Sequence, residues 1–342
     1  MMIPWSFKFF YGLIADTFPI FGSRKKSYII LMSIIQVLCC LGIALFNFGS
    51  ATPLVYLGTG VNLVSAFMDV IVDGMMVQQQ RLDPEYGSEE LQSLSYAFYG
   101  IGGVVGSLFV GYTTQNDCNE LTFIALATIG LLIAIVGFTM SMELESGAEL
   151  RVNMSLKDRI ASNFKDILTG FKIREFYRAI IFFVILWGLI PSFADYFYYY
   201  LTDYAGISEF EFAMTILLSY FCLFFASLAY NAFFREKNIH FMMVLACLTN
   251  VYGAITSFMI VVGWTFGINN FVFVLGSTTI TEVLGTVFIQ LPSTVVFAKM
   301  IPQNIEASLF AIITGLLNFA LFASRELGNL INKFVGADEE NL

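Results

Sequence analysis

The chain has 342 residues, of which 58% are hydrophobic and only 13% are charged. Because a soluble domain carries about a quarter charged residues, this composition excludes a protein that is mostly exposed to water. The formal net charge of −9 argues against a nucleic-acid-binding protein, which would need a basic surface. The mean hydropathy of +0.77 indicates instead an integral membrane protein surrounded mainly by the lipid bilayer.

Ten apolar runs follow one another along the chain, most of them near the 20 or so residues that a membrane-spanning helix needs. They are residues 1–17, 27–48, 53–80, 94–115, 121–142, 176–201, 209–233, 240–263, 269–298 and 306–331. These runs predict the fold class: all-α, a polytopic membrane helix bundle.

One long polar stretch, residues 143–175, separates the fifth run from the sixth. The sequence therefore predicts an N-terminal transmembrane half (1–142), an interdomain loop (143–175) and a C-terminal transmembrane half (176–342). Apolar residues recur in the loop at helical spacing, at Leu156, Ile160, Phe164, Ile167, Leu168 and Phe171. This pattern predicts one or two short helices on the membrane surface, although a solvated linker between two bundles also fits.

Lysine and arginine residues predict the orientation in the membrane. The loops FNFGSATP, TQNDCNE, TDYAGISE and WTFGINN contain neither residue, whereas the alternate loops contain nearly all of them. By the positive-inside rule, the basic side faces the cytoplasm. The chain is thus expected to be a multi-pass membrane protein, in a membrane that the sequence does not identify.

The sequence offers no sign of catalytic chemistry. It has five cysteines and one histidine, His240. The cysteines lie in apolar runs or alone, and their spacing is not that of zinc ligands. With neither a serine–histidine arrangement nor a phosphate-binding loop, we expect no enzyme, no metal and no cofactor.

Four collinear stretches, spread over nearly the whole chain, resemble one family. They are PWSFKFFYGLIADTFPIFGSRKKSYI, MDVIVDGMMVQQQR, LIPSFADYFYYYLTDYAGIS and LPSTVVFAKMIPQNIEASLFAIITGLLN. They resemble, in order, the second helix and its loop, the acidic fourth helix, the seventh helix, and the tenth-to-eleventh helix junction of folate–biopterin transporters, a branch of the major facilitator superfamily. The resemblance implies a fold of twelve helices in two halves, of which this chain would hold helices two to eleven.

The resemblance also implies a function. It predicts a secondary transporter of folate- or pterin-like solutes, coupled to protons and working by alternating access between the two halves. The expected partners are such a solute, protons and the lipid bilayer. Two alternatives stay open: a transporter of another organic solute, and a non-transporting membrane scaffold subunit that keeps this fold.

Lys8 is the first candidate site residue, because it lies in the middle of an apolar run. It precedes Asp16 by eight residues, about 12 Å along a helix, so its ammonium group does not easily reach water. A lysine inside a span usually faces a cavity or a carboxylate. It predicts either a partner for a substrate anion in a central cavity or a structural ion pair.

Asp69 and Asp73 are four residues apart and therefore share one helix face. Two like charges there repel, so one carboxyl should take up a proton more readily than a free aspartate. A proton-coupling site needs this property. Our hypothesis is that Lys8 pairs with one of the two aspartates and that protonation or substrate binding breaks the pair; a static salt bridge is the alternative.

Asp195 and Glu282 are further candidates in the C-terminal half. Asp195 follows Pro191 by one turn, and transporter sites are often built at interrupted helices. Ligand contact, proton coupling and a purely structural role all remain possible for it. Glu282 lies deeper in its run, on one face with Thr278 and Gly285, and is predicted to carry protons.

The charges of these residues suit a pterin or folate. A pterin ring presents adjacent N–H donors that a carboxylate accepts, and the glutamate tail of folate suits a lysine. Aromatic side chains could stack on the ring. The candidates are Trp5, Phe9, Tyr11, Phe193 and Tyr196, although most of the 37 phenylalanines are expected to pack or to face lipid.

The loop after the first run predicts a cytoplasmic gate. It holds Asp16, Gly22, Arg24 and Lys25, which fit the loop motif of the superfamily, and Arg81 is expected to join them. The resemblance implies that the aspartate caps the N-terminus of a neighbouring helix and that the bases pair with acids across the halves. The bases also act as a plain positive-inside signal.

A pair of glycines predicts a close helix contact. Gly102 and Gly106 form a G-x-x-x-G pattern, and small residues at this spacing let membrane helices approach each other.

Overall fold

The structure is a computed structural model that describes residues 3–23, 25–46, 48–140, 156–301 and 306–336. All regular secondary structure in these ranges is helical. Eight segments are long and apolar enough to cross a membrane. They are Lys26–Leu45, Ala51–Leu82, Gly87–Gln115, Glu120–Thr139, Phe210–Phe234, Ile239–Val261, Asn270–Met300 and Glu306–Val335. The predicted fold class, an all-α multi-pass membrane bundle, is confirmed.

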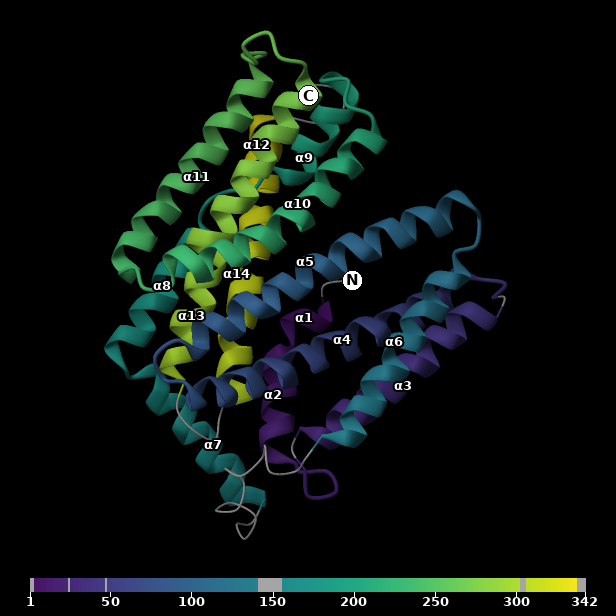
Figure 1. The fold of residues 1–342 in the computed structure, drawn as a ribbon, viewed down its shortest axis with the longest axis vertical. Coiled ribbons are helices and arrows are strands. Elements are labelled where there is room, and N and C mark those ends of the chain that lie inside the picture. Colours follow the sequence, from purple (N-terminus) through teal and green to yellow (C-terminus); the bar gives the residue numbers. More distant parts are fainter. Residues whose placement is uncertain (1–2, 24, 47, 141–155, 302–305, 337–342) are drawn as a thin grey trace. The chain divides into compact units, whose positions relative to one another are not determined.

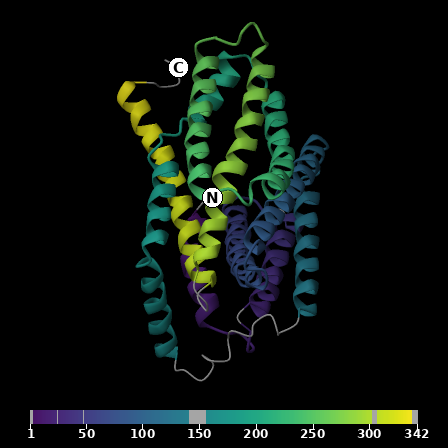
Figure 2. The ribbon, with the colours of Figure 1, turned by 60° about the vertical axis from the view of Figure 1, so that its left-hand side comes forward.

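Most of these segments are single α-helices. In chain order they contain α3 (Lys26–Leu45), α4 (Ala51–Gln79), α5 (Gly87–Gln115), α6 (Glu120–Thr139), α10 (Glu209–Ala229), α11 (Ile239–Val261), α12 (Asn270–Gly285), α13 (Leu291–Met300) and α14 (Glu306–Val335). The last of these is one uninterrupted helix, drawn in yellow in Figure 2. A π-helical segment, Tyr230–Phe234, ends the α10 segment, and another, Thr286–Gln290, joins α12 to α13.

Two predicted runs are interrupted in the structure. The first consists of α1 (Ile3–Ser6) and α2 (Lys8–Thr17). The second is the predicted run 176–201, which breaks at Pro191 as the proline indicated: α8 (Arg174–Gly188) ends before Pro191, and α9 (Ala194–Tyr199) follows as a separate helix. Proline lacks the backbone N–H that a continuing helix needs. The backbone N–H of Ser192 instead donates to the carbonyl oxygen of Ser324, at 3.0 Å.

The polar stretch between the predicted halves contains the predicted amphipathic helix, α7 (Leu156–Phe171). The first part of that stretch lies outside the described residues. The chain divides into two compact units that do not follow the order of the sequence. Unit 1 comprises residues 1–82, 109–182 and 297–319, and unit 2 comprises 83–108, 183–296 and 320–342. The division into halves at 143–175 stays a prediction.

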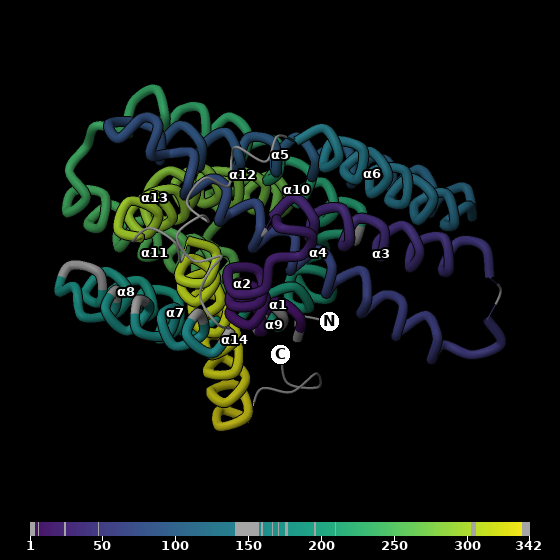
Figure 3. The backbone as a smooth tube through the Cα atoms, turned by 90° about the horizontal axis from the view of Figure 1, so that it is seen from below, coloured from purple at the N-terminus to yellow at the C-terminus, as the bar shows by residue number. Residues whose placement is uncertain are grey.

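The core of unit 1 forms where α3 lies between α4 and α6. Figures 1 and 3 show α3 and α6 side by side along their length. The buried residues here are Ala15, Tyr28, Ile29, Met32, Val64, Phe67 and Ile71. The rings of Tyr11 and Tyr28 stack on Phe67, with centroids 5.2 and 5.3 Å away. This packing fixes α2 and α4 beside each other, which positions the residues of the candidate site.

Unit 2 has its own core between α10, α11 and the α12–α13 segment. Its buried residues are Ala226, Tyr230, Met242, Val287, Leu291 and Val295. Helix α5 approaches α10 through Gly100 and Gly103: a Cβ on Gly100 would lie 2.8 Å from the backbone nitrogen of Phe224, and one on Gly103 would overlap the ring of Tyr220.

The predicted contact at Gly102 and Gly106 is wrong. No described atom lies within 4 Å of a Cβ built on either residue. The glycines that face α10 are three residues apart, so the helix face they define differs from that of the G-x-x-x-G pair.

Candidate functional site

Lys8 and Asp69 form an ion pair inside unit 1. Lys8 is the first residue of α2 and is 5% exposed. Its Nζ atom lies 2.5 Å from Oδ2 of Asp69, which is in the second half of α4. The structure thus brings Lys8 to one of the two predicted aspartates.

Asp73 completes a group of three charges, the Lys8–Asp69–Asp73 cluster. It lies one turn after Asp69 in α4, so the two carboxyl groups share one face of that helix. The cluster therefore holds one ammonium group and two carboxyl groups.

The surroundings of the cluster are partly aromatic. The Nζ atom of Lys8 lies 4.8 Å from the centroid of the Trp5 ring, which is a cation–π distance. Helix α14 passes on another side, where a Cβ on Gly315 would lie 4.0 Å from Cβ of Lys8. Tyr11, another predicted stacking residue, is already used in packing: its ring stacks on Phe67, and it packs against the buried residues Val70, Ala307 and Ala311.

The other two residues predicted for substrate binding or proton coupling, Asp195 and Glu282, lie in unit 2. Asp195 is in α9, and its side chain lies outside what the structure describes. Glu282 is in α12, half-buried and one turn before the π-helical segment Thr286–Gln290. Helix α12 packs against α10 along this segment. Among the described residues, no cation pairs with Glu282.

The described contacts do not join the other three predicted stacking residues, Phe9, Phe193 and Tyr196, to the side chains of the Lys8–Asp69–Asp73 cluster. Phe9 is half-buried and its ring contacts that of Phe10, at 5.2 Å between centroids. Phe193 is 40% exposed and precedes α9, which contains Tyr196. Of the five predicted stacking residues, Trp5 is therefore the one that the described contacts place against Lys8.

Asp16 caps the first turn of α14 in unit 1. Its Oδ2 atom accepts hydrogen bonds from the backbone N–H of Ser308, at 2.8 Å, and from its hydroxyl, at 2.6 Å. An acid at a helix N-terminus satisfies an unpaired N–H and interacts favourably with the helix dipole. The resemblance implied this kind of contact. Its partner, Ser308, was not foreseen, because only the folded chain brings α2 to α14.

Glycines allow these helices to meet. A Cβ on Gly12 would lie 2.7 Å from the carbonyl oxygen of Ala307, and one on Gly74 would lie 2.8 Å from Cβ of Ala307. The start of α14 therefore rests directly on α2 and α4. Gly22, in the loop after α2, has φ +77°, which a glycine adopts at little cost.

Polar side chains also connect the segments around the start of α14 and the end of α4. Nη1 of Arg81 lies 2.7 Å from Oε1 of Glu306, the first residue of α14. Nε2 of Gln80 donates to the carbonyl oxygen of Ala298, and Nζ of Lys25 lies 3.4 Å from that of Gly74. Glu306 was not predicted, although an acid opening an apolar run is a signal of a helix start. Arg24 lies outside the described residues.

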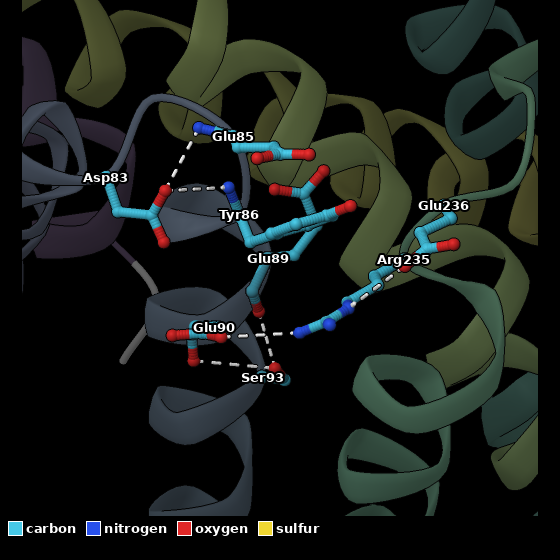
Figure 4. A network of polar contacts seen from close by, with 8 residues as sticks. All are labelled: Asp83, Glu85, Tyr86, Glu89, Glu90, Ser93, Arg235 and Glu236. Atoms are coloured by element: carbon cyan, nitrogen blue, oxygen red, sulfur yellow. Dashed lines mark hydrogen bonds and ion pairs between the residues drawn. The ribbon is translucent and has the colours of Figure 1, made fainter.

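A second contact between helix ends lies in unit 2, and the sequence did not predict it. Figure 4 shows Arg235, at the end of the α10 segment, against Glu90 in the first turn of α5. Nη1 of Arg235 lies 3.3 Å from Oε1 of Glu90, and the guanidinium lies 4.2 Å from the centroid of the Tyr86 ring. Asp83 accepts hydrogen bonds from the backbone of Glu85 and Tyr86, which shapes this turn.

Comparisons with known proteins agree over the whole chain. The BT1 family matches residues 1–342. The "Folate-biopterin transporter" of Synechocystis sp. is 26% identical over 340 residues, which are 98% of this chain and 67% of that protein. The "Probable folate-biopterin transporter 7" of Arabidopsis thaliana is 23% identical over 99% of this chain and 77% of its own length.

A third relative, "Folate transporter 1" of Plasmodium falciparum, is 23% identical over 96% of this chain and 63% of its own length. The chain thus spans roughly two thirds to three quarters of these relatives. The names are those of transporters and not of enzymes.

Proposed function

This chain belongs to the BT1 family, and we propose that it transports folate- or pterin-like solutes across a membrane. The observation that carries the proposal is the Lys8–Asp69–Asp73 cluster, in a chain that matches named folate and folate–biopterin transporters along its whole length. Buried charges within membrane helices are costly, and they usually serve a substrate or ion pathway.

The cluster has the chemistry to recognise such a solute. The ammonium of Lys8 would bind a carboxylate of the folate tail, and a carboxylate of Asp69 or Asp73 would accept N–H groups from the pterin edge. The Trp5 ring beside Lys8 would stack on the pterin. Asp195 is proposed as a further contact of the solute in unit 2.

Proton coupling follows from competition for Lys8. A substrate carboxylate that binds Lys8 would release Asp69, whose charge is then no longer balanced. Asp69 and Asp73 would respond by taking up a proton, because two adjacent carboxylates repel each other. Glu282, half-buried in α12, is proposed to carry a proton in the other unit.

Alternating access would use the contacts at the start of α14. We propose that the predicted halves, 1–142 and 176–342, move relative to each other during transport. Opening the cytoplasmic side would then break the hydrogen bonds of Asp16 to Ser308 and the ion pair of Arg81 with Glu306. The proposed gate residues are Asp16, Gly22, Arg24, Lys25 and Arg81.

The test is uptake of labelled folate and biopterin into vesicles that contain the protein, with and without an imposed proton gradient. We expect Lys8→Ala and Asp73→Asn each to lower uptake by at least tenfold while the protein remains folded in the membrane. Lys237→Ala, at an exposed lysine outside the spans, serves as the matched control and should transport normally. Normal uptake by both cluster variants would contradict the assignment.

The same vesicles distinguish the alternatives. If other organic solutes compete better than folate and biopterin, the substrate class is a different one. If the folded protein takes up none of these solutes, a scaffold role replaces transport, and partners would then be sought by affinity purification.

A further inference from the structure

Helix α7 has one face docked on unit 1. Asn163 is 1% exposed and Ile167 is 6% exposed. Nδ2 of Asn163 donates a hydrogen bond to Oγ1 of Thr17, at 3.0 Å, and Thr17 is itself fully buried. Ile160 and Phe171, which share this face at helical spacing, are half-buried. This docked face fixes how α7 is rotated.

Two connections, one at the middle of α7 and one at its C-terminal end, place this helix near the predicted cytoplasmic boundary of the membrane. Thr17 is the last residue of α2, where the chain leaves its first apolar run for the basic loop. At the C-terminal end of α7, α8 begins at Arg174, and its apolar part begins at Tyr177. Both connections are therefore at the side of the membrane that the basic loops predict to be cytoplasmic.

The neighbouring face of α7, beside the docked one, combines apolar and basic side chains. Phe164 is 45% exposed and Leu168 is 61% exposed. Three exposed lysines flank them: Lys157, Lys165 and Lys172. The positions 157, 161, 164, 165 and 168 form one continuous stripe on α7, and Lys172 follows directly after its last residue. Asp158, the only acid among the described side chains of α7, borders this stripe.

We propose that this stripe binds the cytoplasmic leaflet through anionic lipid headgroups. Apolar side chains on a helix with lysines beside them are typical of helices that lie in a membrane interface. Each lysine near an anionic surface favours binding by roughly fivefold, and the cytoplasmic side is the one that the basic loops predict. Because Asn163 holds Thr17, lipid bound to α7 would also restrain the end of α2, next to Asp16.

The test places a fluorescent probe on the stripe of the full chain in lipid vesicles. In a protein whose native cysteines have been replaced, Leu168→Cys is labelled with bimane, and brominated lipids are used as quenchers. Thr169→Cys is the matched control, because Thr169 is also exposed and adjacent but lies off the stripe. We expect strong quenching at 168 by brominated phosphatidylglycerol, less by brominated phosphatidylcholine, and weak quenching at 169 by both.

A second variant tests the lysines. Replacing Lys157, Lys165 and Lys172 together by glutamine should bring quenching at 168 by the two lipids to the same level. Quenching at 168 no stronger than at 169 would overturn the proposal, since the stripe would then face water or protein. Equal quenching by both lipids in the unaltered protein would overturn it too, because the lysines would add no preference. Uptake is not the readout, so these outcomes are independent of the proposed transport.

Discussion

Gly100 and Gly102 show how much a single helix position can matter. They lie two residues apart in α5, but a Cβ on Gly100 would lie 2.8 Å from backbone atoms of Phe224 and Tyr220, whereas Gly102 faces open space. Backbone atoms of a packed helix cannot rotate away. Gly100→Ala is therefore expected to destabilise the protein by about 1–3 kcal/mol through overpacking.

Gly102→Ala is the control in the same helix. It is expected to be neutral or stabilising by up to about 1 kcal/mol, because alanine favours the helical backbone. Thermal unfolding of the purified protein in detergent measures both. An equal loss of stability in the two variants would show that α5 does not meet α10 through Gly100.

Residues such as Lys8, Asp69 and Asp73 could be found from the sequence, because a charge within an apolar run is conspicuous and the spacing of the aspartates fixes their common face. Ser308, Glu306 and Arg235 could not. Each is an ordinary residue at a helix end, and its role depends on a partner that is distant in the sequence.

At the level of elements, two ion pairs join the end of one helix to the start of another, but they differ in burial. Arg81 pairs with Glu306, whose side chain is 4% exposed, whereas Arg235 pairs with Glu90, whose side chain is 52% exposed. An exposed pair contributes about 0–1 kcal/mol, because water and salt screen it. Loss of the partner of a buried carboxylate costs about 3–5 kcal/mol.

Arg81→Gln should therefore lower stability clearly more than Arg235→Gln does. The cation–π contact with Tyr86 adds about 0.5–1 kcal/mol to the second pair, which leaves the order unchanged. Denaturation in detergent at low and high salt measures the loss of stability in each variant. Only the contribution of the Arg235 pair should weaken markedly with salt. The reverse order would mean that the helix dipole of α14 already stabilises Glu306 without Arg81.

On the scale of the whole molecule, composition and run lengths predicted the all-α membrane bundle, because a bilayer requires apolar helices of a set length. These signals alone do not mark the break at Pro191, since the residues on both sides of it remain apolar; that break was predicted from the proline itself. They also did not predict the two units, because helices far apart in the sequence share them. Pairing between such helices is decided by the fit of their surfaces, as at Gly12 and Ala307.

The orientation of the whole molecule is the feature that the charge pattern predicts most directly. Cys118 lies between α5 and α6, in one of the loops without lysine or arginine, and is partly exposed. Lys237 lies in a basic loop before α11. A membrane-impermeant maleimide should therefore label Cys118 in intact cells that express the protein in their plasma membrane. A cysteine introduced by Lys237→Cys should react only after the cells are permeabilised. Labelling at 237 but not at 118 in intact cells would reverse the orientation, and the gate around Asp16 and α7 would then face away from the cytoplasm.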